Sequence, residues 1–189
     1  IGAQTHFLLA QPYLGDTART LEKRGATCLR APFPLGAEGT KAWLHAAARA
    51  WDIDDAHFEQ TIGAPMARAQ RAVAAHREAL QGKRLSFLPD SQLEIPLARF
   101  LSRECGMELV EVGTPFLDRR LATAELALLP KGVRLTEGQD LDRQLDRVRS
   151  DRPDLTVCGL GIANPLEAEG LRTKWSIELT FTPIQGFDQ

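Results

Sequence analysis

The sequence predicts an α/β fold in which short parallel strands alternate with helices. Four apolar runs in the second half of the chain are bounded by turn-forming or polar residues. These runs are residues 84–88, 107–112, 132–135 and 155–160. Apolar residues at helical spacing lie between the first two runs, namely Leu93, Leu97, Phe100 and Leu101, and between the last two, namely Leu141, Leu145 and Val148. This alternation is typical of parallel strands joined by right-handed crossovers.

The first half of the chain shows the same alternation on a smaller scale. Apolar runs at residues 5–10 and 26–31 flank a helix that Gly25 should end, and a second helix should begin near Ala37. A polar, alanine-rich helix follows, with an interruption predicted near Pro65. We therefore expect a partial Rossmann-like α/β domain over residues 1–55, a long connecting helix over residues 56–82, and a second Rossmann-like α/β domain over residues 83–189.

Composition excludes several classes of partner. The 189 residues are 43% hydrophobic and 25% charged, and the net charge is −2 with basic and acidic residues interleaved. Neither nucleic acid nor an anionic membrane surface is expected as the main partner. No apolar stretch reaches the roughly 20 residues of a membrane span. Ile1 and Gln189 are expected to be cut ends within a longer protein.

The three cysteines do not form a recognisable site. Cys28, Cys105 and Cys158 are far apart and lack the spacing of a disulfide framework or a local metal site. They fit a reducing, cytoplasmic setting as small buried hydrophobes. No catalytic residue, cofactor-binding motif or metal ligand is expected within this chain.

Residues 155–181 contain the most informative pattern. Gly159-x-Gly161 follows an apolar strand, but the third glycine of a dinucleotide motif and any Gly-Lys-Ser/Thr phosphate loop are missing. Asn164 is expected to cap a helix that has Pro165 at its first position. An alternating run then predicts a strand that presents one apolar face, formed by Trp175, Ile177, Leu179 and Phe181. Core packing or a wall against a planar ligand would each explain that face.

The turn after the strand at residues 84–88 should face the same edge as Gly159. Ser91 and Glu94 have capping-box spacing, which would start a helix at Ser91. Pro96 favours a later start that places it at the first helical position. In that case residues 90–94 would form an ordered loop available to a ligand or partner.

Several sequence segments carry a resemblance to a known family. They are residues 6–13, 31–36, 89–100, 137–140 and 164–170, together with the stretch that ends at Phe181-Thr182-Pro183. They resemble the N subunits of light-independent (dark-operative) protochlorophyllide reductases, which are nitrogenase component-1-like proteins. The resemblance covers essentially the whole chain, and it implies that this chain is the central and C-terminal part of a subunit with three Rossmann-like domains.

The resemblance implies an enzyme, its partners and a substrate wall. Two N and two B subunits would form an N2B2 heterotetramer that reduces the C17–C18 double bond of ring D of protochlorophyllide. An ATP-hydrolysing iron-sulfur L protein, which would also hold the ATP-Mg, would supply electrons through a 4Fe-4S cluster. The cluster ligands would be three cysteines upstream of this chain and an aspartate of the B subunit. Trp175 and Phe181 match aromatic residues that line the substrate cavity.

Three other interpretations of the function remain open. The chain could be the equivalent subunit of chlorophyllide reductase, a two-domain transferase that binds a sugar nucleotide, or a non-catalytic scaffold. The transferase reading predicts a diphosphate-binding glycine loop, which the sequence lacks.

Overall fold

The computed structural model describes residues 1–138 and 140–187. In chain order the elements are β1 (His6–Phe7), α1 (Gly15–Lys23), β2 (Thr27–Cys28), α2 (Gly36–Ala50), α3 (Asp55–Leu80), β3 (Arg84–Phe87), α4 (Glu94–Arg103), β4 (Glu108–Thr114), α5 (Arg119–Leu126), β5 (Arg134–Glu137), α6 (Leu141–Asp151), β6 (Leu155–Cys158), α7 (Leu160–Ala168), β7 (Thr173–Trp175) and α8 (Ser176–Thr180).

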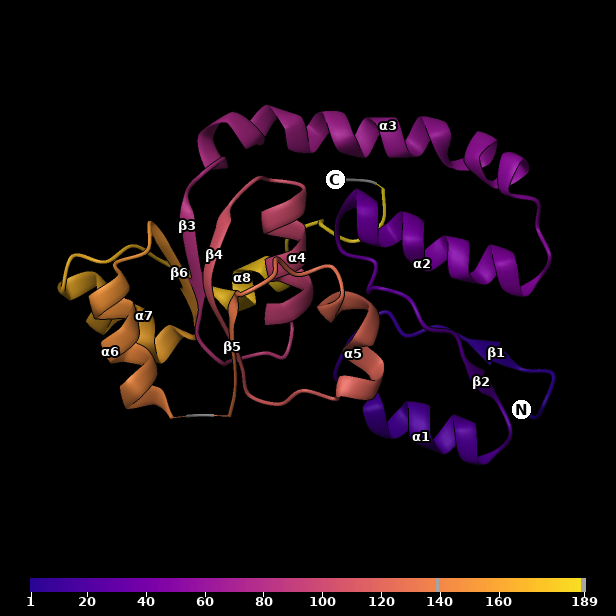
Figure 1. The fold of residues 1–189 in the computed structure, drawn as a ribbon, viewed down its shortest axis with the longest axis horizontal. Helices are drawn as coiled ribbons and strands as arrows, with labels where there is room; N and C mark the ends of the chain where they lie inside the picture. Colours follow the sequence, from indigo (N-terminus) through magenta and orange to yellow (C-terminus); the bar gives the residue numbers. More distant parts are fainter. Residues whose placement is uncertain (139, 188–189) are drawn as a thin grey trace.

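Two parallel sheets confirm the predicted α/β class. Strands β1 and β2 pair with each other, and the second sheet has the strand order β5-β4-β3-β6-β7 with every pair parallel. Helix α3 runs along both sheets, as Figure 1 shows. The proposed division at residues 1–55, 56–82 and 83–189 stays a prediction.

The central strand β3 is buried on both faces. Leu85 and Phe87 pack with Leu97 of α4, whereas Leu88 packs with Cys158 and with residues of α6 and α7. Figure 1 shows α4 on one side of the strands and α6 and α7 on the other. A strand covered by helices on both faces needs a continuous apolar run, which is the pattern that predicted it.

The first sheet and helix α3 differ from the prediction. Only two residues of each predicted strand pair in β1 and β2, because each of these strands has only the other as a partner. Helix α3 continues through Pro65 without the predicted interruption. Its buried Phe58, Ile62 and Ala69 lie on both sides of the proline, so packing sustains the helix despite one missing backbone hydrogen bond.

Two predicted features of the C-terminal region are wrong. Helix α7 begins at Leu160, immediately after β6, so Pro165 lies inside the helix and Asn164 is not its cap. The predicted strand through Phe181 stops at Trp175, where α8 begins. Strand β7 pairs only with β6, whose last residue, Cys158, lies opposite Trp175, and no strand remains to extend the pairing.

Helix α5 was absent from the sequence prediction. Asp118 caps it by accepting hydrogen bonds from the backbone N–H groups of Arg120 and Leu121, at 3.1 and 3.3 Å. The aspartate before a segment with Leu121, Ala122 and Glu125 on one face is a signal that could have located it.

A buried arginine joins the first part of the chain to the five-stranded sheet. The Arg99 side chain is fully buried, and its Nε lies 2.9 Å from Oε2 of the equally buried Glu125. Its Nη2 donates to the backbone carbonyls of Phe33 and Leu35, at 3.1 and 2.7 Å. The second Glu125 oxygen accepts from the Phe33 N–H at 2.7 Å. Buried charges persist when they are paired and hydrogen-bonded in this way.

The adjoining stretch needs glycine at two positions. Gly36 has φ +70°, and a Cβ there would collide with Phe100 and Glu104. A Cβ at Gly39 would collide with the Arg99 guanidinium. Only glycine lets this backbone approach α4 so closely.

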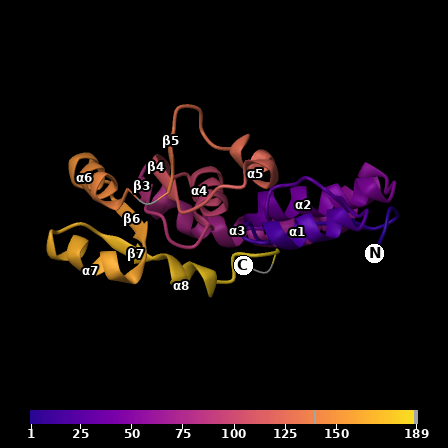
Figure 2. The same ribbon diagram turned by 90° about the horizontal axis from the view of Figure 1, so that it is seen from below.

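The C-terminal segment binds the other side of the same stretch. The Gly36 N–H donates to the Ile184 carbonyl at 2.7 Å, and the Gly186 N–H donates to the Pro34 carbonyl at 3.2 Å. Leu35 and Gln185 form an antiparallel bridge. Figure 2 shows this segment running from α8 toward the first part of the chain.

The opposite face of the sheet carries a buried carboxylate. Arg147 of α6 donates to both Glu111 oxygens, at 2.6 and 2.5 Å. Thr136 and Arg134 of β5 donate to the same carboxylate, at 2.9 and 3.2 Å. Burial opposes ionisation, but these hydrogen bonds outweigh it and hold the Glu111 pKa below its ordinary value. The carboxylate therefore links α6 to the edge of the sheet.

We expect Arg99→Met to lower the free energy of unfolding by about 3 to 5 kcal/mol, because it leaves the Glu125 charge buried and unpaired. The control is Arg103→Met, one turn further along α4, where the arginine forms a partly exposed pair with Glu38. That change should cost at most about 1 kcal/mol. Chemical denaturation followed by circular dichroism measures both, and equal losses would contradict the role assigned to Arg99.

We expect the contribution of Glu111 to stability to depend on pH. Because its folded-state pKa is lowered, the stabilisation is complete above the unfolded-state pKa and is lost as pH falls through the folded-state value. Glu111→Gln should cost about 2 kcal/mol at neutral pH, and the difference from the unchanged chain should shrink below about pH 5. Denaturation across pH tests this against Glu108→Gln, an exposed position on the same strand. A pH-independent difference would argue against it.

Candidate functional site

The strand order of the larger sheet locates the candidate site. From β3 the chain proceeds outward to β4 and β5 on one side, and then returns to β6 and β7 on the other. The order therefore reverses between β3 and β6. In open parallel sheets, ligands bind outside the carboxyl ends of the strands at such a switch point. The loops after β3, β6 and β7 meet there.

A glutamate carboxylate accepts hydrogen bonds from the backbone N–H groups of the loop after β3. The N–H groups of Asp90, Ser91 and Gln92 donate to Oε1 of Glu94, at 2.9, 2.6 and 3.2 Å. Thr114, at the end of β4, donates to Oε2 at 2.9 Å. Burial raises the pKa of the Glu94 carboxyl, and these hydrogen bonds oppose the rise. Donors that could bind an anionic ligand are thus satisfied from within the chain.

The start of α4 lies between the two predicted alternatives. The helix begins at Glu94, so Pro96 is its third residue. Proline has no N–H, and an N–H at this position would lack a helical partner in any case. Ser91 accepts a hydrogen bond from the Leu93 N–H at 3.2 Å instead of capping the helix directly. The second alternative predicted a loop over residues 90–94 with Pro96 first in the helix. In the structure residues 90–93 precede the helix and Glu94 begins it.

Asp90 lies where three strand ends meet. Its Oδ2 accepts a hydrogen bond from the Ser176 hydroxyl at the start of α8. Its Oδ1 lies 2.7 Å from the position that a Cβ on Gly159 would occupy. A side chain at position 159 would displace the Asp90 carboxylate, which is a structural explanation for one of the two glycines.

The two predicted substrate residues occupy different environments. Trp175 ends β7 and packs partly buried against the cluster that contains Leu88 and Cys158. Phe181 follows α8 and is 82% exposed. Ile177 is half-exposed and Leu179 packs into the core, so the four residues do not share one strand face.

Further apolar side chains are exposed in the segments that follow the strands of this sheet. Phe116 follows β4, Leu160 follows β6, and Ile177 and Phe181 follow β7, with exposed fractions of 55%, 53%, 50% and 82%. Phe116 and Leu160 were not identified from the sequence, although each comes within two residues of a strand end.

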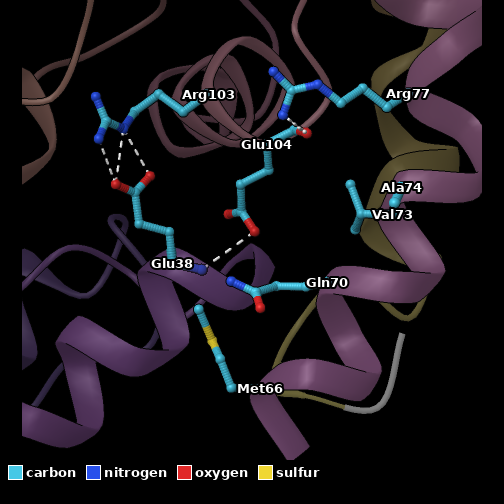
Figure 3. Close-up of a pocket in the computed structure, with 8 residues that line it drawn as sticks. All are labelled: Glu38, Met66, Gln70, Val73, Ala74, Arg77, Arg103 and Glu104. Carbon is cyan, nitrogen blue, oxygen red and sulfur yellow. Dashed lines mark hydrogen bonds and ion pairs between the residues drawn. The ribbon is translucent and has the colours of Figure 1, made fainter. Parts of the chain in front are cut away.

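A hollow of about 590 Å³ lies elsewhere, between α2, α3 and the end of α4 (Figure 3). Arg103 pairs with both oxygens of Glu38, at 2.6 to 2.9 Å, and Glu104 accepts from the Ala37 N–H at 2.7 Å. The apolar part of the lining comes from Met66, Val73 and Ala74. Because these charged groups have partners within the chain, we assign this hollow no chemistry.

The cysteines do not fit an iron-sulfur cluster. Cys28, Cys105 and Cys158 lie on β2, after α4 and on β6. Burial raises the pKa of the Cys105 and Cys158 thiols to about 11, which disfavours the thiolate that ligation requires. Within residues 1–138 and 140–187, no three or more His, Cys, Asp or Glu side chains are grouped to hold a metal ion.

Among the described residues, no helix combines the length and the apolar character needed to cross a membrane.

Comparison with known proteins places this architecture in a family. Residues 1–188 match the family described as nitrogenase component 1 type oxidoreductase. Light-independent protochlorophyllide reductase subunit N of Bradyrhizobium sp. strain BTAi1 is 67% identical over 189 residues, which are 100% of this chain and 44% of that protein. The subunit N of Rhodopseudomonas palustris strain BisB18 is 66% identical with the same coverage.

A solved structure supports the fold independently. The structure titled "Nitrogenase Cp1 at pH 6.5" has a TM-score of 0.65 and 20% identity, and the match covers 97% of this chain and 39% of that chain. The predicted resemblance is confirmed, and the chain spans less than half the length of the relatives it matches. The chain belongs to the nitrogenase component 1 type oxidoreductase family.

Proposed function

We propose that this chain is part of the N subunit of a light-independent protochlorophyllide reductase and supplies one wall of its substrate cavity. The observation that carries the proposal is the 67% identity over the whole chain to a protein of that name. The complete enzyme would be an N2B2 heterotetramer that reduces the C17–C18 double bond of protochlorophyllide. It would work in the cytoplasm, or in the chloroplast stroma for a plastid-encoded chain.

The chemistry of the carboxyl edge supports a pigment as the ligand. A macrocycle offers a large, flat, apolar surface, and it binds by burying that surface against aromatic and aliphatic side chains. Trp175 is packed at the end of β7, and Phe181 is exposed after α8. Phe116, Leu160 and Ile177 are further exposed apolar side chains that follow β4, β6 and β7. Partner chains that cover this edge would complete the cavity.

The electron-transfer parts of the proposed enzyme lie outside this chain. The cysteines present do not fit a 4Fe-4S cluster, so we assign its ligands to the upstream part of the subunit and to the B subunit. ATP-Mg would bind to the L protein, the electron donor. This chain would bind and orient the pigment, and we assign it no catalytic residue.

The Glu94 contacts weaken the alternative of a sugar-nucleotide transferase. In that class a diphosphate would bind to free backbone N–H groups at the switch point. Here the loop donors already bind the Glu94 carboxylate. A subunit of chlorophyllide reductase would use the same apolar edge, and the names of the relatives favour protochlorophyllide.

We expect Trp175→Ala and Phe181→Ala, each introduced into the full-length N subunit, to weaken protochlorophyllide binding about tenfold or more. Losing the buried area of one aromatic side chain costs roughly 1.5 to 3 kcal/mol, and 1.4 kcal/mol corresponds to a factor of ten. Titration of the pigment against the assembled N2B2 complex, followed by absorption, measures the affinity. Cluster content and assembly should not change.

The matched control is Trp51→Ala. Trp51 is 60% exposed at the end of α2, away from the carboxyl edge of the larger sheet, so its loss should leave pigment affinity unchanged. Unchanged affinity in both the Trp175 and Phe181 variants would refute the proposed wall.

A further inference from the structure

We infer that Asp90 is a positioning residue for Trp175, which it holds at the switch-point crevice through the hydroxyl of Ser176. The inference rests on the proposed function, in which Trp175 contacts the pigment. It assigns a role to a carboxylate that neither the sequence motifs nor the family match identified.

The contact falls on the residue directly after the tryptophan. Ser176 is the first residue of α8, it is 2% exposed, and its Oγ donates to Oδ2 of Asp90. A buried hydroxyl without an acceptor is costly, and a charged acceptor makes the hydrogen bond stronger. The bond therefore fixes the backbone at the junction between β7 and α8.

Among the described residues, the other contacts at this junction are an exposed ion pair between Lys174 of β7 and Glu178 of α8 and the packing of Leu179 against the core. An exposed ion pair contributes little to stability. Strand β7 lies at the edge of the sheet, has three residues and pairs only with β6. Helix α8 has five residues and no side-chain hydrogen bond at its N-cap, which is Trp175 itself. Packing against the cluster of Leu88 and Cys158 positions the indole only as long as the backbone beneath it stays in place.

Asp90 is itself held in a fixed position. Its N–H donates to Glu94 at 2.9 Å, and Glu94 also binds Thr114 of β4. Its Oδ1 lies against Gly159 at the end of β6. Contacts with β4 and β6 thus hold Asp90, which follows β3, in one position. The hydrogen bond from Ser176 then ties the end of β7 to this fixed carboxylate.

The test is a double-mutant cycle in the assembled N2B2 complex that contains the full-length N subunit. The variants are Asp90→Ala, Trp175→Ala and the double variant, and the measurements are the pigment Kd and the steady-state KM and kcat. Asp90→Ala should weaken binding about fivefold and raise KM more than it lowers kcat. In the Trp175→Ala background, the same change should alter the Kd less than twofold, because the side chain it positions is gone.

A second pair of variants removes only the hydroxyl, in case Asp90→Ala does not fold. Ser176→Ala should reproduce the loss of affinity, whereas Ser176→Thr, which keeps the hydroxyl, should bind the pigment as the unchanged subunit does. The matched control is Asp154→Asn. This aspartate accepts a backbone hydrogen bond from Arg84 at the opposite end of β3, at 2.8 Å, and its loss should not affect the Kd.

The outcomes separate the inference from the proposed function. Equal effects of Asp90→Ala with and without Trp175 would overturn the inference, as would unchanged affinity in Asp90→Ala and Ser176→Ala when Trp175→Ala binds weakly. Unchanged affinity in Trp175→Ala alone would instead overturn the role of Trp175 in the proposed function, and the inference with it.

Discussion

The rest of the structure depends on the buried guanidinium of Arg99. A fully buried positive charge must be paired and hydrogen-bonded, and the chain meets this requirement with Glu125 and the carbonyls of Phe33 and Leu35. Because Phe33 and Leu35 come from the first part of the chain and Glu125 from α5, satisfying one charge fixes both to α4. The C-terminal segment then pairs with the same stretch through Leu35 and Gln185, so three distant parts of the chain meet at one ion pair.

The same helix sets the geometry of the switch point. Glu94, the first residue of α4, accepts hydrogen bonds from the N–H groups of the loop after β3. Arg99, more than one turn later, binds the middle of the helix to Glu125 and to the stretch that contains Phe33 and Leu35. A shift of α4 along its axis would break both sets of contacts. The helix therefore couples the junction between the two sheets to the loop that carries Asp90.

The sequence predicted those elements whose local pattern agrees with their tertiary setting. Strand β3 and helix α4 have apolar residues at the expected period and form as expected, and Gly25 and Gly106 adopt the positive φ that ends a helix. The prediction for the C-terminal region was wrong because the sequence pattern there is ambiguous. Residues 175–181 alternate like a strand, yet β6 ends opposite Trp175 and leaves them no partner. Asp90 and Ser176 are 86 positions apart, and no local signal relates them.

These contacts satisfy the polar groups that a nucleotide would use at the switch point. In a dinucleotide-binding sheet, the glycines and helix N-termini at the switch point stay open to phosphate groups. Here the Glu94 carboxylate accepts hydrogen bonds from the N–H groups of the loop after β3. The Asp90 carboxylate occupies the space beside Gly159 and accepts a hydrogen bond from the Ser176 hydroxyl. With these polar groups satisfied from within the chain, the partly buried indole of Trp175 is the aromatic group that packs beside them. A ligand that binds beside such satisfied groups would gain affinity mainly from its apolar area, which is the kind of ligand that the proposed function assigns to this edge.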